Sequence, residues 1–170
     1  GNCIQDDDFH DFGSLWIRAD GIIYAVPVYH MGFPSSLQAA IERLGQVFFA
    51  SSEGKYLRFC KAGGAIVQGH TQYGGQEFTI QAIVDHLILM NCIPVSGDMP
   101  HSYVGVGAQA ERDCREDLEK NEGVKKSARS LGRRVAEMAQ VLKFGIAGLK
   151  KYLPPDYFYD RERKFAPPKK

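Results

Sequence analysis

Residues 19–43 have the pattern of a strand, a loop and a helix in direct succession, which points to the α/β class. Positions 22–28 are almost all apolar, as is typical of a strand covered on both faces in a parallel sheet. The apolar run breaks at residues 27–32, and a helix is predicted over 35–49, with Pro34 fitting its first turn. Because ligands of open α/β sheets bind in loops that leave the carboxyl ends of strands, residues 27–32 are a candidate binding loop.

A second succession of the same kind follows. A strand predicted over 63–69 leads through a Gly-rich loop into a helix from about Gln76 to Met90. Its apolar residues form a broad stripe that we expect to be buried: Phe78, Ile80, Ile83, Val84, Leu87 and Ile88.

A short helix is predicted near the start of the chain from the apolar spacing of Phe9, Phe12, Leu15 and Trp16. A short strand and two helices are predicted after residue 90. Residues 92–97 form the strand, and Pro94 indicates that it lies at an edge of the sheet. A loop containing Gly105 and Gly107 comes next, and helices are expected near 109–120 and 124–143 with a break at Gly123.

Composition describes a single globular domain without an unusual charge. The chain has 170 residues, enough to bury a sizeable core, and 44% of them are hydrophobic. A formal net charge of +1 gives no field that would attract nucleic acid or an anionic membrane surface. Since the sequence has no apolar run of bilayer length and no signal-peptide pattern, we expect a cytoplasmic protein.

The cysteines and nucleophiles exclude other classes of site. Cys3, Cys60, Cys92 and Cys114 show no CxxC spacing, which argues against a zinc site or a disulfide scaffold within the chain. Cys92 lies in the apolar segment 92–97 and is most simply a small core residue. No Ser/His/Asp or Cys/His set has a recognisable spacing, which argues against hydrolytic chemistry.

Three blocks of sequence resemble the flavodoxin-like NAD(P)H-dependent FMN reductase family, which includes the iron–sulfur flavoproteins. Residues 19–43 are similar to the family's third strand, loop and helix, and residues 61–79 to its fourth strand and Gly-rich loop, here Tyr73-Gly-Gly-Gln-Glu77. Residues 105–108, Asp117 and residues 128–136 are similar to its last loop and terminal helix. The resemblance covers roughly residues 1–140 and implies a flavodoxin-like three-layer α/β/α fold, with strands 3, 4 and 5 of a parallel sheet in this chain.

The resemblance also implies that FMN is held by two loops and no single catalytic side chain, because the flavin carries the chemistry. The implied cofactor-binding residues are Pro27, Val28, Tyr29, His30, Met31, Gly32, Gly69, His70, Thr71, Gln72, Tyr73, Gly74 and Gly75. Gly32 would permit a close turn, and Tyr29 or His30 would cover a ring face. Main-chain N–H groups at Gly74 and Gly75 would approach the ring, and the helix from Gln76 would favour the negative charge of reduced flavin.

Some positions depart from the family pattern. Val26 stands where relatives usually have Ser or Thr, which removes a hydroxyl contact to the flavin. His70 and Tyr73 replace a Gly and an Asn of the second loop. His30 and His70 therefore have two readings, as hydrogen-bonding partners of flavin or nicotinamide and as plainly exposed loop residues.

Residues 1–8 resemble the stretch in which iron–sulfur members complete a cysteine cluster, so Cys3 is a candidate iron–sulfur ligand if further cysteines lie upstream. One cysteine cannot hold a cluster alone, and cluster-free relatives keep some of these cysteines. Strand candidates exist only for the third, fourth and fifth positions, so the first two strands and the phosphate loop, about fifty to sixty residues, are expected to be missing. The strand at 21–28 would then have an unpaired edge, and we expect the chain to be part of a longer protein or to receive strands from a partner.

Residues 1–145 are thus predicted to form an N-terminally incomplete flavodoxin-like FMN-binding domain, with residues 146–170 as a C-terminal extension that packs on the domain or on a neighbouring subunit. The leading hypothesis is an oxidoreductase that passes electrons from NAD(P)H through FMN to a second acceptor, as a homodimer or homotetramer. Two alternatives remain open. One is an electron carrier, with or without an iron–sulfur cluster, that a ferredoxin-type partner reduces, and the other is a flavin-free interaction module.

Overall fold

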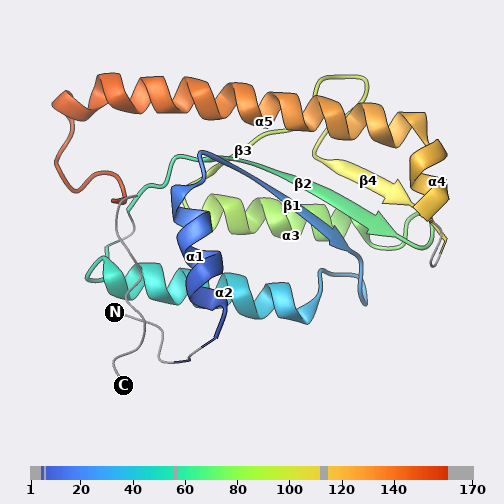
Figure 1. Ribbon diagram of the computed structural model, residues 1–170, viewed down its shortest axis with the longest axis horizontal. Coiled ribbons are helices and arrows are strands. Elements are labelled where there is room, and N and C mark those ends of the chain that lie inside the picture. Colours follow the sequence, from blue (N-terminus) through green and yellow to red (C-terminus); the bar gives the residue numbers. More distant parts are fainter. Residues whose placement is uncertain (1–4, 6, 56, 112–114, 161–170) are drawn as a thin grey trace.

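The computed structural model describes residues 5, 7–55, 57–111 and 115–160 (Figure 1). The elements follow in the order α1 (Phe9–Arg18), β1 (Gly21–Pro27), α2 (Ser35–Ser51), β2 (Ala62–Gly69), α3 (Gln76–Leu89), β3 (Ile93–Pro94), β4 (Val106–Gln109), α4 (Arg115–Lys120), α5 (Glu122–Leu149) and the 3-10 turn η1 (Lys150–Tyr152). The predicted strands at 21–28 and 63–69 and the helices that follow them are confirmed to within two residues.

β2 is the central strand of a parallel sheet. β1 pairs with it from Gly21 opposite Ala62 to Pro27 opposite Gln68. Both β3 and β4 pair with β2 as well, β3 at residues 62–63 and β4 at residues 66–69. Because a strand has only two edges, β3 and β4 lie on the same edge of β2 and form one strand position that residues 95–105 interrupt.

This interruption corrects the prediction for residues 92–109. The predicted strand at 92–97 shrinks to two residues, and the predicted loop around Gly107 is a strand. The ladder stops after Pro94 and Val95, and the chain returns to the same edge at Val106, where Val106 and Ala108 are buried and Gly107 and Gln109 are exposed. A four-residue strand that contains a glycine is too short for an apolar pattern to reveal.

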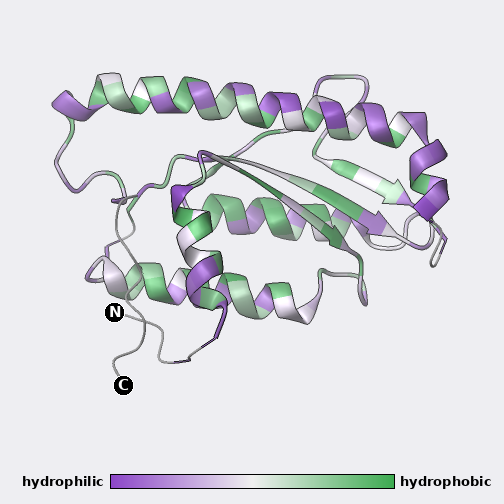
Figure 2. Ribbon diagram, in the orientation of Figure 1, coloured by the Kyte–Doolittle hydropathy of each residue, from purple (hydrophilic) through white to green (hydrophobic). Residues whose placement is uncertain are grey.

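Helices cover both faces of the sheet, so the three-layer α/β/α architecture is confirmed (Figure 1). One core cluster joins α1, α2 and α3 to the sheet through residues such as Trp16, Leu44 and Ile83. A second, smaller cluster places Leu131, Val135 and Ala139 of α5 on the other face. Figure 2 shows α3 as mainly hydrophobic and α5 as rich in hydrophilic residues, in keeping with the more exposed position of α5.

The buried side of α3 is narrower than predicted. Ile80, Ile83 and Leu87 are buried, whereas Phe78 is 69% and Ile88 57% exposed. The helix instead buries polar side chains on its sheet-facing side, Gln76, Thr79 and His86. Because three of the buried residues are polar, the apolar residues alone did not identify the buried face of α3.

The C-terminal helices also differ from the prediction. The break lies at Asn121, whose Oδ1 accepts a hydrogen bond from Val124 N at 3.0 Å and so caps α5, and not at Gly123. α5 then continues to Leu149, across the expected division between residues 145 and 146. Beyond it, Tyr159 is buried against the rings of Phe48 and Phe59, so the extension packs on the domain there, while Tyr152 is exposed.

Among the described residues, β1 pairs with no strand other than β2, so β1 forms an edge of the sheet. Across the same residues, we find no helix with the length and apolar character that crossing a membrane requires.

Candidate functional site

Two loops meet where β1 and β2 end at the same edge of the sheet. Val28 N donates to Gln68 O at 2.7 Å, which keeps the first loop attached to β2 beyond the strand. A Cβ atom at Gly75 of the second loop would lie 2.9 Å from Met31 Cα and 3.2 Å from Val28 Cγ1 of the first. The two loops predicted to form a site are therefore in direct contact, and only a glycine fits at their junction.

The first loop is a tight turn with two left-handed residues. Tyr29 and Gly32 exchange backbone hydrogen bonds of 2.7 and 3.0 Å, with His30 (φ 49°) and Met31 (φ 66°) between them. Positive φ at both central positions makes this a type I′ turn, which non-glycine residues adopt at a cost. We expected Gly32 to supply the unusual conformation, but the strain lies in His30 and Met31 instead.

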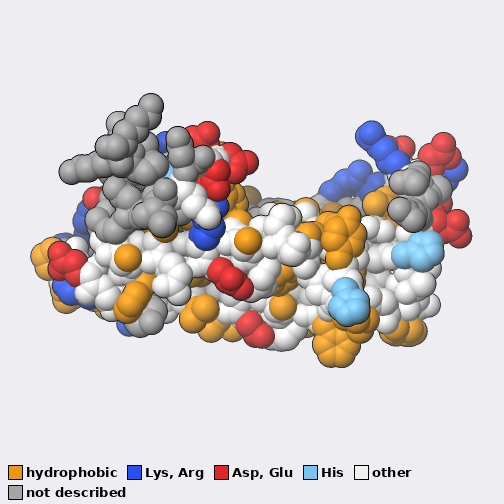
Figure 3. Space-filling view, turned by 90° about the horizontal axis from the view of Figure 1, so that it is seen from below, with side chains coloured by type: hydrophobic (Ala, Val, Ile, Leu, Met, Phe, Trp, Pro, Cys, Tyr) orange, Lys and Arg blue, Asp and Glu red, His pale blue; other side chains and the backbone are white. Residues whose placement is uncertain are grey.

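The turn also directs three side chains of the first loop toward solvent. The side chain of Tyr29 is 64% and that of Met31 52% exposed, and His30 is exposed as well. Figure 3 shows apolar and histidine side chains gathered at this end of the molecule. An exposed ring and thioether of this kind suit the face of a flat ligand.

The second loop, residues 69–75, is held in place by Gln76, which was not among the predicted site residues. Gln76, the first residue of α3, is 6% exposed, and its Nε2 donates to Thr71 O at 2.7 Å and to Ala108 O at 3.4 Å. Its amide lies over Gly69, where a Cβ atom would approach Nε2 to 2.5 Å. Gln76 thus ties the loop to β4, and its place in the Gly-rich motif Tyr73-Gly-Gly-Gln-Glu77 was the sequence signal for it.

The amide oxygen of Gln76 is buried and accepts no hydrogen bond in the described structure. Nε2 faces two carbonyl oxygens, so turning the amide over would set oxygen against oxygen and cannot solve the deficit. A buried acceptor without a donor is uncommon in native proteins, and a bound water or ligand at this position would satisfy it.

Backbone donors are also available around the junction. Among the described contacts, the N–H groups of His30, Met31, Tyr73 and Gly75 donate to no other residue. Tyr73 (φ 58°) and Gly75 (φ 108°) are left-handed, and Tyr73 is 79% exposed. The N-terminus of α3 begins directly behind them and adds a partial positive charge. Free donors, an exposed aromatic ring and a positive helix end fit the hydrogen-bonding edge of an isoalloxazine ring.

The other predicted residues have lesser roles in this geometry. Pro27 and Gly69 are the last residues of β1 and β2, and His70 and Gln72 are exposed. Cys3 lies outside the described residues. Within the described part of the chain, no group of three or more His, Cys, Asp or Glu side chains is arranged to hold a metal ion.

A buried polar chain fixes the strand that leads into the first loop. Trp16 Nε1 donates to Tyr24 Oη at 2.8 Å, and Tyr24 Oη lies 2.9 Å from His86 Nε2. Burial lowers the pKa of His86 to about 4 and raises the pKa of Tyr24 above its usual value. A neutral His86 is thus hydrogen-bonded to the Tyr24 hydroxyl, and α1, β1 and α3 are joined behind the site.

A family model described as NADPH-dependent FMN reductase matches residues 1–111, the segment that contains both loops. The chain belongs to this family. An iron–sulfur flavoprotein of Methanocaldococcus jannaschii is 34% identical over 146 residues, which are 84% of this chain and 70% of that protein. An iron–sulfur flavoprotein of Archaeoglobus fulgidus is 32% identical over 141 residues, 83% of this chain and 70% of that protein.

A solved structure supports the fold of this FMN reductase family member. The flavodoxin, WrbA-like protein from Agrobacterium tumefaciens superposes with a TM-score of 0.60 at 22% identity, over 79% of this chain and 78% of that one. The flavodoxin-like fold is thereby confirmed.

Proposed function

We propose that the protein binds FMN between residues 27–32 and 69–75 and acts as an oxidoreductase that transfers electrons from NAD(P)H to a second acceptor. The observation that carries this proposal is the junction at Gly75, where two strand-end loops touch and leave backbone donors unused. Membership of a family described as NADPH-dependent FMN reductases supports it.

The chain's own residues would hold and tune the cofactor. FMN supplies the hydride and electron chemistry when it is bound. The free N–H groups of Tyr73 and Gly75 are placed to donate to the polar edge of the ring, and Tyr29 is exposed enough to cover an apolar face. The N-terminus of α3 would stabilise negative charge near these donors and so favour the reduced state.

The first experiment is FMN titration of the purified full-length protein, followed by visible absorption and steady-state oxidation of NADH and NADPH. Retained FMN together with turnover supports the oxidoreductase. FMN binding without turnover favours an electron carrier, and failure to bind FMN at all would leave the flavin-free interaction module.

A variant of Gln76 tests whether the site is where we place it. Gln76→Met removes the amide that holds residues 70–75, so we expect FMN affinity to fall by about tenfold or more, since one buried hydrogen bond is worth about that factor. Gln81→Met is the matched control, because Gln81 lies on the exposed side of the same helix and bonds only Asp85. Equal affinity of the two variants would move the cofactor away from these loops.

The names of the relatives favour a second candidate. Both relatives compared above are iron–sulfur flavoproteins, so a carrier with a cluster that includes Cys3 is the alternative. Iron and acid-labile sulfide in the full-length protein, lost in Cys3→Ser, would support it. The homo-oligomeric state, the acceptor and the cytoplasmic location stay predictions.

A further inference from the structure

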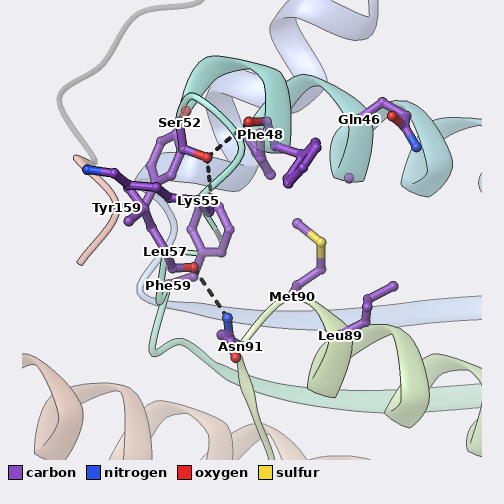
Figure 4. A pocket seen from close by; sticks show the side chains of 12 residues that line it. Gln46, Phe48, Ser52, Lys55, Leu57, Phe59, Leu89, Met90, Asn91 and Tyr159 are labelled. Atoms are coloured by element: carbon purple, nitrogen blue, oxygen red, sulfur yellow. Dashed lines mark hydrogen bonds between the residues drawn. The ribbon is translucent and has the colours of Figure 1, made fainter. Parts of the chain in front are cut away.

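A cavity of about 250 Å³ lies at the end of the molecule opposite the two loops. Its walls come from the last turns of α2 and α3, from the segment that leads into β2, and from Tyr159. Figure 4 shows the side chains of Phe48, Phe59, Met90 and Tyr159 arranged around one hollow. The α2 residues that line the cavity begin at Gly45, ten residues after the start of the helix at Ser35, so the cavity lies about 15 to 25 Å from the first loop at the usual helical rise.

The floor of the cavity is a rigid aromatic cluster. Phe59 and Tyr159 stack with ring centroids 4.7 Å apart, and Phe48 lies 4.8 Å from Phe59. All three residues are at most 5% exposed, and Tyr159 Oη is hydrogen-bonded to Ser51 Oγ at 2.8 Å. Packing on every other side therefore holds these rings in place with their free surfaces toward the hollow.

The polar groups at the mouth are already engaged with the protein. Lys55 Nζ pairs with Asp156 at 2.6 Å, and Ser52 Oγ donates to the carbonyl oxygens of Phe49 and Lys55. Asn91 Nδ2 reaches Leu57 O at 3.5 Å. Gln46 also lines the cavity, but its amide is neutral. A charged ligand would therefore lose its hydration without meeting an unpaired charged side chain among the described lining residues.

Gly45 is a position at which the cavity can be filled by substitution. It lies in the middle of α2 and lines the cavity, and a Cβ atom built on it would meet nothing within 4 Å. A glycine in a helix interior costs about 1 kcal/mol of stability relative to alanine. No neighbouring atom requires a glycine at this position. A larger side chain at this position would instead occupy the cavity.

We propose that this cavity binds a neutral, planar aromatic molecule of one or two rings. An apolar cavity of about 150 Å³ is already sufficient for benzene, so the larger volume here admits a fused pair of rings. The distance from the two loops excludes contact with a flavin held there, so the bound molecule would act as an effector or a stabilising ligand and not as a hydride acceptor. The proposal does not depend on FMN binding.

Trp16 provides the readout. It is the single tryptophan of the sequence, and its ring lies 5.2 Å from Phe48 and 4.8 Å from Phe59, directly behind the floor. The protein is titrated with naphthalene and with p-xylene while Trp16 emission and two-dimensional NMR shifts are followed. We expect saturable changes confined to Trp16 and the residues that line the cavity, and at least about tenfold weaker binding of 2-naphthoate because its charge finds no free partner.

Gly45→Leu is the blocking variant, and it is expected to fold because leucine favours the helix and its Cβ meets no neighbour. Naphthalene binding should fall at least about tenfold in this variant. Gly132→Leu on α5 is the matched control, since that glycine also has open space around it and lies outside the cavity, and it should bind as the unaltered protein does. Absence of saturable binding, or equal binding by a folded Gly45→Leu variant, would overturn the proposal.

Discussion

At the scale of single residues, Gly75 decides whether the two loops can meet. Gly75→Ala puts a Cβ atom 2.9 Å from Met31 Cα, and it does so at a φ of 108° that side chains rarely adopt. We expect the unfolding free energy to drop by about 1–3 kcal/mol and FMN affinity to fall by about tenfold or more, because the loop must move to relieve the contact. Chemical denaturation and FMN titration measure the two effects.

Gly145→Ala is the control for this substitution, since a Cβ atom there meets nothing within 4 Å and an alanine favours the helix. It should raise stability slightly and leave FMN affinity unchanged. If Gly75→Ala bound FMN as tightly as this control, the junction of the loops would not form the site.

His86 makes the stability of the protein depend on pH. Burial lowers its pKa to about 4 from 6.5, so the unfolded chain takes up a proton at a higher pH than the folded protein does. The stability that neutral His86 provides is complete above pH 6.5 and is lost as the pH falls toward 4. The loss should reach on the order of 3 kcal/mol, measured by urea denaturation across this range.

His86→Gln tests the assignment, because an amide can still form a hydrogen bond with the Tyr24 hydroxyl but does not titrate. The variant should lose most of the slope between pH 6.5 and 4. His101→Gln, at an exposed position, is the control and should keep it. An unchanged slope in His86→Gln would assign the pH dependence to another group.

At the scale of elements, the attachment of α1 depends on a buried lysine. Lys61, directly before β2, is fully buried, and its Nζ donates to Ile17 O at 2.5 Å and to Ala19 O. A positive charge at the C-terminal end of α1 complements the helix dipole, and the ammonium also lies 5.3 Å from the ring of Trp16. The lysine thus joins α1 to the start of the central strand.

Lys61→Met keeps the apolar stem but leaves two carbonyl oxygens without their donor. We expect it to lower the unfolding free energy by about 2–4 kcal/mol in chemical denaturation. Lys143→Met, which breaks the exposed pair with Asp20, should cost less than about 1 kcal/mol. Similar losses in the two variants would mean that the buried contacts of Lys61 contribute little.

The elements also show what a pattern of residues can predict. β1, α2, β2 and α3 were placed to within two residues because each has a long apolar run or a helical period. β4 was missed because its four residues carry no strand pattern of their own and form a strand only by pairing with the free edge of β2. α5 runs past Gly145 and Gly148, which look like helix breakers but cost only propensity at exposed positions.

For the candidate site, topology located both loops, since parallel strands must end at one edge. The left-handed turn at His30 and Met31 could not be predicted, because neither side chain favours positive φ. Gln76 was missed because its role comes from Thr71 and Ala108, which only the folded chain brings to it.

At the scale of the whole molecule, two adjacent glycines of β2 let both helix layers approach the sheet. A Cβ atom at Gly63 would lie 2.7 Å from Leu87 Cδ1 of α3, and one at Gly64 would lie 2.8 Å from Leu131 Cδ1 of α5. Both leucines are fully buried and cannot turn away into solvent. The central strand therefore fixes the spacing of all three layers.

Double-mutant cycles test this arrangement. Gly63→Ala and Gly64→Ala should each lower the unfolding free energy by about 1–3 kcal/mol through overpacking. Leu87→Val should relieve part of the cost of Gly63→Ala, with a coupling of at least about 0.5 kcal/mol, while it adds to Gly64→Ala without coupling. Leu131→Val should behave in the opposite way, since Leu131 packs on the other face. Coupling of either leucine to both glycines would mean that the sheet shifts as a unit between the two helix layers. If no leucine–glycine pair showed coupling, neither helix would be held at the spacing described here.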